Sequence, residues 1–592
     1  MPSPSPFLSL CFLALLPLLT ACYDYSDELI TEQQLAQARV DGEVQLAMTL
    51  SENTATRMTA TETQASDGSF LGITQIYAIP FGPASGTIAG SDQTLYHPYG
   101  LGGISSSDNN TQNVFTATTP YTKSKLYAPF PKVVGTTAYL VYAFGGGDSQ
   151  AHGKVSGLSA DDMAAVTTAS SLQPSPVSFV SGGTDAQKAK GQALADYLTT
   201  IANATGWAAS SDADYAAART DFLRLHAASS LDVKATVQGL YTLLSNKTDA
   251  VATAIKAAIT GTGNANATVS GTGFQTVVTL SQSLSNYPSE MGLPDGAAAI
   301  AWDAAENKFV TNSSENTGIV ETSGNTLLVT PLDHFVYPLP LIYCVSSPVV
   351  TSNADETDHW ADDTAWSAIT SNYTDGGMVL STTQSVAVKD QLNYAVARLE
   401  TQVRASAGQL ADYRETSISL TNGSDPSFPI TGLLVGGQKK VNFEFHPDDS
   451  DADYYVVYDA TMPSSDYSLT TNAMDTQPTI HTLLFESEKA STTKLRVPVA
   501  VELQNNSGQD FYGVNGDMVP KGAKFYLAGI IDMTDNSGLR ALEQDHVTTI
   551  KCTIGTLKSA YNVVPDLRDT RLNIGLTVQP WIVSTPSNAE LF

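Results

Sequence analysis

The chain has 592 residues, a formal net charge of −29 and a hydrophobic content of 42%. This length allows two to four domains, each with a substantial core. The negative charge argues against nucleic acid and against anionic membrane surfaces as partners, because both carry charge of the same sign.

An apolar run of signal-peptide length, Phe7–Leu19, lies near the start of the chain. It is too short to span a bilayer as a stable helix. The LTAC sequence at 19–22 has the form of a lipobox, in which small residues fit the signal peptidase and a cysteine thiol receives the lipid. We therefore expect a lipoprotein signal peptide over 1–22, with Cys22 as the lipidation site and membrane anchor. A plain secretory signal cut near Ala21 is the alternative.

Residues 43–57 (EVQLAMTLSENTATR) combine a strand pattern with a polar loop that ends at an arginine. Only Arg39 and Arg57 are basic before Lys123, and only a cut at Arg57 would release the strand. The mature chain would then begin at Met58, which makes 23–57 a propeptide with a removable first strand. Alternating apolar residues define one face of that strand: Val44, Leu46, Met48 and Leu50.

The same alternation recurs near the other end of the chain, at Arg571–Val578. An emptied slot in a β-sandwich exposes unpaired backbone and an apolar trough, which favours addition of a strand from a neighbouring molecule. Four apolar side chains would contribute about 6–12 kcal/mol before ordering costs. The alternative is that both strands are ordinary sandwich strands that never move. The apolar donor residues are Leu572, Ile574, Leu576 and Val578.

The middle of the chain changes from strand to helix patterns and back. Runs rich in β-branched and aromatic residues predict strands at Phe70–Phe81, Lys125–Tyr127 and Thr137–Phe144. Between about 184 and 260 the apolar spacing predicts three or four helices, and Ser211–Asp214 resembles a capping box. Strands are expected again at Gln275–Leu280 and Thr326–Leu332.

The remainder of the chain reads mostly as short strands. The proline-punctuated stretch Pro331–Pro348 is expected to cross into the next domain. One further helix fits the spacing of apolar residues between Val388 and Val403. From Thr416 onward the turn spacing is that of a β-sandwich. The expected strands are Val441–Phe445, Tyr454–Val457, Lys494–Val501, Lys524–Ile531 and Val547–Ile554.

These patterns predict a mostly β fold with an α-helical insert and two β domains, of which the second has the strand spacing of a β-sandwich. We expect one domain over 58–340, with the insert at about 184–260, and the other over 341–592. Cys552 shares an apolar face with Ile550 and Ile554 and is expected to be a buried thiol. Whether it forms a disulfide with Cys344 is left open by the sequence.

No constellation in the sequence predicts catalysis. The loop Gly145–Gly153 holds Asp, Ser and His, but it lacks the G-x-S-x-G spacing and its strand-turn-helix context. The aspartates within 448–453 fail the EF-hand pattern, since Tyr454 and Ala460 stand where Gly and Glu are required. We therefore expect no enzyme activity, no metal and no cofactor.

Several segments resemble a known family. The chain looks like a fimbrial subunit (fimbrillin) of the Bacteroidetes type V pilus family, nearest its short-fimbria major-subunit branch. The most specific matching segments are Asn505–Asn515, Lys524–Leu527 and Gln544–Arg568. Further matches are the lipobox at 19–22, Thr56–Ala60, Phe70–Ile73, Ile79–Phe81, Leu392–Leu399 and Gly432–Gln438.

This resemblance implies export as a lipoprotein, cleavage by an Arg-specific protease after the first strand, and assembly by strand exchange through the C-terminal strands. It implies two transthyretin-like β-sandwich domains, with Arg57 as the maturation site and 567–592 as the donor region. The implied partners are copies of the chain itself, other fimbrial subunits, the protease and a transient outer-membrane lipid anchor. The implied location is an outer-membrane precursor and then an extracellular fimbrium that supports adhesion.

Two alternatives stay open at this point. A tip or anchor subunit of the same fibre would share the sequence features of a shaft subunit. A glycan-binding surface lipoprotein would need exposed aromatic platforms, for which Trp360 and Trp366 are the candidates.

Overall fold

The computed structural model describes residues 43–50, 72–82, 94–95, 99–105, 124–126, 130–131, 138–145, 155–156, 173–174, 185–225, 230–260, 267–270, 277–280, 300–311, 319–322, 325–328, 330–348, 350–351, 386–442, 445–447, 454–460, 467–487, 496–532, 542–544, 546–567 and 575–579. Contacts divide the chain into two compact units. The first unit takes 1–148, 164–169 and 341–394, and the second takes 149–163, 170–340 and 395–592. Each unit thus combines residues from both sides of the boundary that was expected at 340. The expected domain boundaries themselves stay a prediction.

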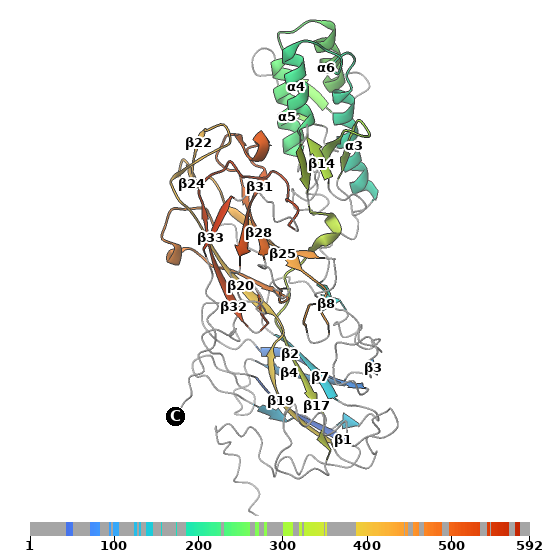
Figure 1. The fold of residues 1–592 in the computed structure, drawn as a ribbon, viewed down its shortest axis with the longest axis vertical. Coiled ribbons are helices and arrows are strands. Elements are labelled where there is room, and N and C mark those ends of the chain that lie inside the picture. The colour runs from blue at the N-terminus through green and yellow to red at the C-terminus, as the bar shows by residue number, and fades with distance from the viewer. Residues whose placement is uncertain are drawn as a thin grey trace, which may run out of the picture. The chain divides into compact units, whose positions relative to one another are not determined.

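The first unit contains a ten-stranded sheet (Figure 1). Its strands are β1 (Glu43–Leu50), β2 (Gly72–Gly82), β3 (Thr94–Leu95), β4 (Tyr99–Ser105), β5 (Ser124–Leu126), β6 (Phe130–Pro131), β7 (Ala138–Gly145), β17 (Ile342–Pro348), β18 (Val350–Thr351) and β19 (Val386–Tyr394). They follow the order β3-β2-β7-β17-β19-β1-β5, and β4, β6 and β18 pair with β2, β1 and β19. The strands expected at Phe70–Phe81, Lys125–Tyr127 and Thr137–Phe144 are confirmed as β2, β5 and β7.

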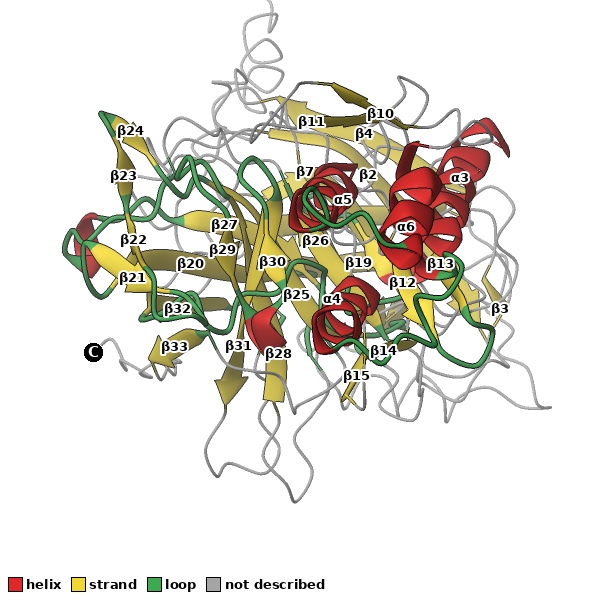
Figure 2. Ribbon diagram, turned by 90° about the horizontal axis from the view of Figure 1, so that it is seen from above, coloured by secondary structure: helices red, strands yellow, loops and turns green. Residues whose placement is uncertain are grey.

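Among its described residues the second unit has four helices, in agreement with the three or four that the apolar spacing predicted. They are α3 (Asp185–Ala202), α4 (Ala213–Leu223), α5 (Ser230–Leu243) and α6 (Ala250–Thr260). Each buries one stripe of apolar residues in a common cluster, because residues three or four apart share a helix face. The helices group together in Figure 2, and the hairpin of β12 (Ile300–Asp303) and β13 (Lys308–Thr311) packs against α3.

Shorter elements accompany these helices and the strands that follow. The two-stranded pairs are β8 (Val155–Ser156) with β9 (Gln173–Pro174), β10 (Ala267–Ser270) with β11 (Val277–Leu280), β14 (Ile319–Thr322) with β15 (Asn325–Leu328), β21 (Gln409–Ala411) with β22 (Ser417–Ser419), β23 (Thr421–Asn422) with β24 (Asp425–Pro426), and β29 (Phe511–Tyr512) with β30 (Met518–Val519). The 3-10 turns in the described part of the chain are η3 (Leu332–His334), η4 (Met474–Thr476) and η5 (Val514–Gly516).

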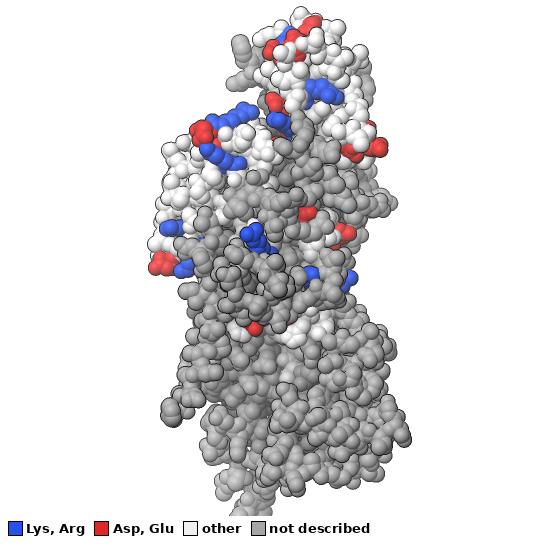
Figure 3. Space-filling model, in the orientation of Figure 1, with Lys and Arg blue, Asp and Glu red and all other residues white. Residues whose placement is uncertain are grey.

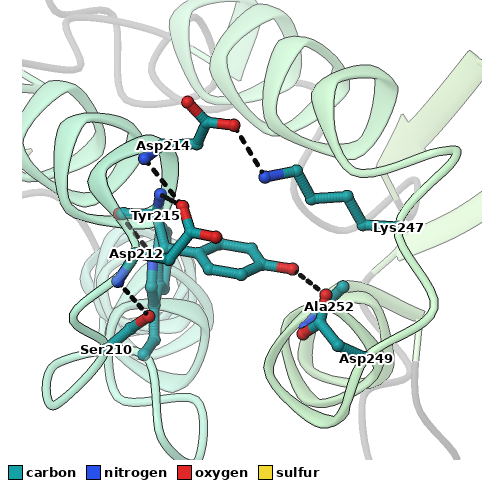
Figure 4. Close-up of polar contacts among 8 residues, drawn as sticks. Ser210, Asp212, Asp214, Tyr215, Lys247, Asp249 and Ala252 are labelled. Carbon is teal, nitrogen blue, oxygen red and sulfur yellow. Dashed lines mark hydrogen bonds and ion pairs between the residues drawn. The ribbon is translucent and has the colours of Figure 1, made fainter.

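A polar network ties the start of α4 to the start of α6 (Figure 4). Asp212 is the N-cap of α4, and its carboxylate accepts hydrogen bonds from the backbone N–H groups of residues 214 and 215. The Asp249 carboxylate accepts from the first N–H groups of α6 and also from the Tyr215 hydroxyl. Lys247 pairs with Asp214 at 2.9 Å and lies 4.5 Å from the centroid of the Tyr215 ring. The expected capping box was wrong by one residue, because Asp212 and not Ser211 caps the helix.

Tyr215→Phe should lower the free energy of unfolding by about 1 kcal/mol, because a charged hydrogen bond to Asp249 is lost. Burial and the neighbouring Asp249 carboxylate raise the pKa of Tyr215 to about 12. The native chain should therefore lose stability as the pH rises from about 10 to about 12, and the variant should lose less. Urea unfolding across this pH range measures both effects.

Tyr241→Phe is the matched control for this prediction. Tyr241 lies half-buried on α5, and its hydroxyl has no hydrogen-bond partner among the described residues. Its removal should leave both the stability at neutral pH and the alkaline slope nearly unchanged. Equal losses in the two variants would contradict the role assigned to the Tyr215 hydroxyl.

Two sheets of the second unit face each other as a β-sandwich. One sheet has the order β16 (Phe335–Val336), β26 (Tyr455–Asp459), β25 (Ile430–Gln438), β28 (Arg496–Gln504) and β31 (Lys524–Asp532). The other has the order β27 (Ile480–Leu484), β20 (Ala397–Ala405), β32 (Val547–Ile554) and β33 (Leu576–Gln579). Inward residues of both sheets form one buried cluster, and β32 alternates strictly between buried and half-buried positions. A mostly β fold with a helical segment is thus confirmed.

The helix expected between Val388 and Val403 was wrong. This stretch forms β19 and β20, which are separated by residues 395 and 396 and belong to different units. In β20, Leu399 and Val403 are buried with the other odd-numbered residues, so their spacing of four also fits a strand. The alternation was hidden because Arg398, at an even-numbered position, is buried as well.

The strand expected over Val441–Phe445 was also wrong. Val441 forms an isolated bridge with Pro447, and the Asn442 N–H donates to the His446 carbonyl. Phe445 has a φ of 66°, which reverses the chain where a strand would continue. The other four strands expected after Thr416 are confirmed as β26, β28, β31 and β32.

Both remaining cysteines are buried free thiols, which answers the question that the sequence left open. Cys344 lies in β17 of the first unit and Cys552 lies in β32 of the second. Burial raises the pKa of the Cys552 thiol to about 12, so the thiol stays protonated at neutral pH. In the described part of the chain, no helix is long and apolar enough to cross a membrane.

Candidate functional site

The first strand, β1, has hydrogen-bonded neighbours on both sides. It pairs in parallel with β19 along a continuous register from Val44 opposite Val386 to Leu50 opposite Leu392. Its other edge pairs antiparallel with β5, where Ala47 lies opposite Leu126, and with β6. The first strand therefore occupies an internal position of the sheet.

This pairing differs from the hairpin pairings around it. Parallel strands cannot be joined by a tight turn. In the sequence, β19 follows β1 only after most of the other strands of the first unit. The backbone of β1 is thus held by interstrand hydrogen bonds on two edges and by the chain that follows Leu50. Without β1, the facing edges of β19, β5 and β6 would lose their hydrogen-bond partners.

The apolar residues predicted for the removable first strand all lie in β1. Val44, Leu46, Met48 and Leu50 stand opposite Val386, Val388, Asp390 and Leu392 of β19. Arg57 and Met58, the predicted maturation site, lie outside the described residues, as does Cys22.

The predicted donor residues are only partly described. Leu576 and Val578 lie in β33, opposite Ile554 and Cys552 of β32, whereas Leu572 and Ile574 lie outside the described residues. Leu576 is 1% exposed and belongs to the core of its own sandwich. The Gly575 N–H donates to the Ala528 carbonyl of β31 at 2.9 Å. Within one molecule the structure therefore keeps the two candidate strands in separate sheets.

A buried carboxylate that the sequence did not predict lies in β28. Glu502 is fully buried and pairs with the Lys524 ammonium at 2.8 Å. Its oxygens also accept hydrogen bonds from the hydroxyls of Thr431 at 2.7 Å, Tyr526 at 3.0 Å and Tyr458 at 3.2 Å. These partners come from three strands other than β28, so no local spacing could have revealed them. Because donors saturate the carboxylate, this cluster serves to hold the sheet together.

A second titratable cluster joins β20 and β27. The Arg398 guanidinium lies 2.7 Å from both the Glu400 carboxylate and the Nδ1 atom of His481. Burial, followed by the positive charge of Arg398, lowers the pKa of His481 to about 4, so the imidazole is neutral at pH 7. Among the described residues no group of His, Cys, Asp and Glu is arranged to hold a metal ion. The acidic run within 448–453, the loop after Gly145 and both Trp360 and Trp366 lie outside the described residues.

Comparisons with known proteins give only distant likenesses. No protein-family profile and no curated protein matches the chain. A solved structure from Bacteroides eggerthii, provisionally named a cell adhesion protein, is 9% identical over 91% of this chain and 95% of its own, with a TM-score of 0.29. Proteins with the same provisional name from Parabacteroides distasonis and Bacteroides fragilis are 10% and 11% identical, with TM-scores of 0.21 and 0.17.

The coverage of these two further structures differs. The Parabacteroides likeness spans 92% of this chain and 100% of the other, and the Bacteroides fragilis likeness spans 49% and 80%. With TM-scores this low, no argument about fold or function rests on these likenesses.

Proposed function

We propose that this chain is a structural subunit of a cell-surface fimbrium. In this proposal, an Arg-specific protease cuts after Arg57, β1 leaves its sheet, and the C-terminal strand of a neighbouring copy takes its place. The subunit is exported as an outer-membrane lipoprotein through Cys22 and ends in an extracellular fibre without enzymatic activity. The broader form of this proposal is a role in cell adhesion, which is the term in the names of the three solved structures.

The observation that carries the proposal is the internal, parallel position of β1. An N-terminal strand at a sheet edge could be lost with little consequence, whereas loss of β1 would open a slot between β19 and the β5–β6 edge. Such a slot selects an extended segment with alternating apolar residues, and Arg571–Val578 has that pattern. This reasoning applies equally to a shaft subunit and to a tip subunit, which differ in copy number along the fibre.

The test is the N-terminal sequence of protein sheared from cells that express the chain. We expect a start at Met58 in high-mass ladders that dissociate on heating. Arg57→Ala should abolish the ladders and leave a folded, exported precursor. Arg39→Ala is the matched control, because it removes the other early basic residue without affecting release of β1. Abundant ladders from the Arg57→Ala variant, or a lipidated monomer that starts at Cys22, would overturn the proposal.

A further inference from the structure

The sequence contains the dipeptide Asn-Gly twice, at Asn422-Gly423 and at Asn515-Gly516. In such a pair the backbone nitrogen of the glycine can attack the side-chain carbonyl carbon of the asparagine and expel its amide group. Glycine hinders this attack least, because it has no Cβ and leaves the backbone free to rotate. Both pairs lie among the described residues of the second unit, so their surroundings can be compared directly.

The first pair lies at the tip of the hairpin of β23 and β24, at the margin of the sandwich (Figure 2). Asn422 pairs with Asp425, and Gly423 has a φ of 66°, which suits the first position of a Gly-X hairpin loop. Residues 421–426 are all exposed. In the described part of the chain, no hydrogen bond engages the Gly423 N–H. The nitrogen that the attack requires is therefore available.

This hairpin is also short enough to open locally. Its two strands have two residues each, and Pro426, which lies opposite Thr421, has no N–H to donate to the ladder. Short exposed elements with few hydrogen bonds open at a small cost in free energy. Opening matters because the extended backbone at Asn422 must rotate before the side chain can reach the next nitrogen.

The second pair is held firmly within the turn η5. The Gly516 N–H donates to the Gly513 carbonyl at 3.0 Å, so the nitrogen that would attack is already engaged. The Gly513 N–H donates in turn to the carbonyl of Asp517 at 2.7 Å, and both residues are buried. A Cβ on Gly513 would lie 1.9 Å from the Ala560 carbonyl oxygen, so this turn is packed closely against its neighbour. The same dipeptide is thus protected at Asn515.

The Asn422 side chain joins its hairpin to a second turn. Its Nδ2 group donates to the Asn506 carbonyl at 3.1 Å, and the Asn506 N–H donates to the Ser427 carbonyl at 2.8 Å. A carboxylate in place of the Asn422 amide could not donate, and it would stand directly opposite Asp425 in the hairpin. Loss of the amide would therefore remove one hydrogen bond and add a pair of like charges.

From these observations we propose that Asn422 is a site of spontaneous deamidation, which releases the β23–β24 hairpin from the turn at Asn506. The Gly423 nitrogen forms a bond to the Asn422 side-chain carbonyl carbon, the bond from that carbon to Nδ2 breaks, and the Gly423 proton leaves with Nδ2 as ammonia. Water then opens the cyclic imide to aspartate or isoaspartate. The reaction consumes only water, and it does not depend on fibre assembly.

The effect of the new carboxylate is local. The chain already has 59 acidic residues, and Figure 3 shows acidic and basic side chains interspersed over the described part of the face that it draws. One further negative charge therefore changes the overall field little, whereas the lost hydrogen bond and the neighbouring Asp425 act directly on the hairpin.

The test is a time course of the uncut, full-length protein at mildly alkaline pH, followed by mass spectrometry of its peptides. The peptide that contains Asn422 should exchange NH2 for OH at least about tenfold faster than the peptide that contains Asn515, because only the second site must first lose a packed turn. In urea the two rates should become similar, since the dipeptides are the same. Asn422→Gln should almost abolish the reaction at its site, because the longer side chain would have to close a larger ring.

Asn422→Asp reproduces the product and tests the release of the hairpin. The peptide amides of 421–427 should exchange with deuterated solvent about tenfold faster than in the native chain. Asn472→Asp is the matched control, because it places the same charge on an exposed asparagine of the same unit whose side-chain amide has no hydrogen bond in the described part of the chain. Exchange over 421–427 should stay native in this control. Equal deamidation at the two sites of the folded protein, faster reaction at Asn515, or native exchange in Asn422→Asp would overturn the proposal.

Discussion

Glu502→Ala should lower the free energy of unfolding of the second unit by about 3–5 kcal/mol, because it removes one partner of a buried ion pair. The loss exceeds that of a single hydrogen bond, since three hydroxyls and one ammonium converge on this carboxylate. The tyrosine hydroxyls are buried and would keep no acceptor at that position.

Urea unfolding at pH 7 measures this effect, with Glu415→Ala as the control. Glu415 also pairs with a lysine, Lys558, but its side chain is 73% exposed. An exposed pair contributes at most about 1 kcal/mol, so the control should unfold close to the native chain. Similar unfolding midpoints for the two variants would show that the buried cluster does not stabilise the sandwich.

The helices could be predicted from the sequence because each buries a single face. Leu194, Leu198 and Ile201 of α3 are all fully buried, and their spacing is that of one helix stripe. The alternation of Val547–Ile554 was equally informative, since every second residue of β32 enters the sandwich core. Where one face of an element is buried and the other is not, period alone identifies the element.

The segment around β19 and β20 shows why period alone can fail. Four consecutive residues are buried where one strand ends and the next begins: Tyr394, Ala395, Val396 and Ala397. The apolar pattern there therefore fits neither a period of two nor a period of 3.6 residues. The error matters for the candidate site, because β19 is the parallel partner of β1. The sequence could thus predict the first strand but not the strand that lies beside it.

The contact between Asn422 and Asn506 and the Glu502 cluster could not have been predicted from the sequence. The two asparagines belong to a hairpin and a turn far apart in the chain, and only folding brings them together. The three strands that supply the contacts of Glu502 are likewise brought together only by sheet pairing. Local patterns carry no information about such juxtapositions, whereas they carry most of the information about individual elements.

A synthetic peptide of residues 571–592 should block fibre growth when it is present in molar excess while the precursor is cut at Arg57. If the slot beside β19 accepts the C-terminal strand of another copy, then the free peptide competes for the same hydrogen bonds and apolar positions. High-mass ladders should shrink to capped monomers as the peptide concentration rises. The readout is the ladder on unheated gels, together with the mass of the peptide in the capped monomer.

This competition separates donation from stability, which deletion of the donor region does not. Leu576 is buried in the core of its own sandwich and Leu567 in the cluster that also contains the helices, so deleting 567–592 would remove core residues as well as the donor. The control peptide carries Leu572→Asp and Ile574→Asp, which places charge at two apolar positions and should remove the block.

A second peptide, residues 43–50, tests the slot independently of the donor. It has the sequence of β1 and can restore the native register from Val44 opposite Val386 to Leu50 opposite Leu392. If the 43–50 peptide blocks growth while the 571–592 peptide does not, growth passes through the vacated position of β1, but the donor strand has been assigned wrongly. If neither peptide shortens the ladders, the growth of the fibre does not pass through the vacated position of β1, and strand exchange at this site is refuted.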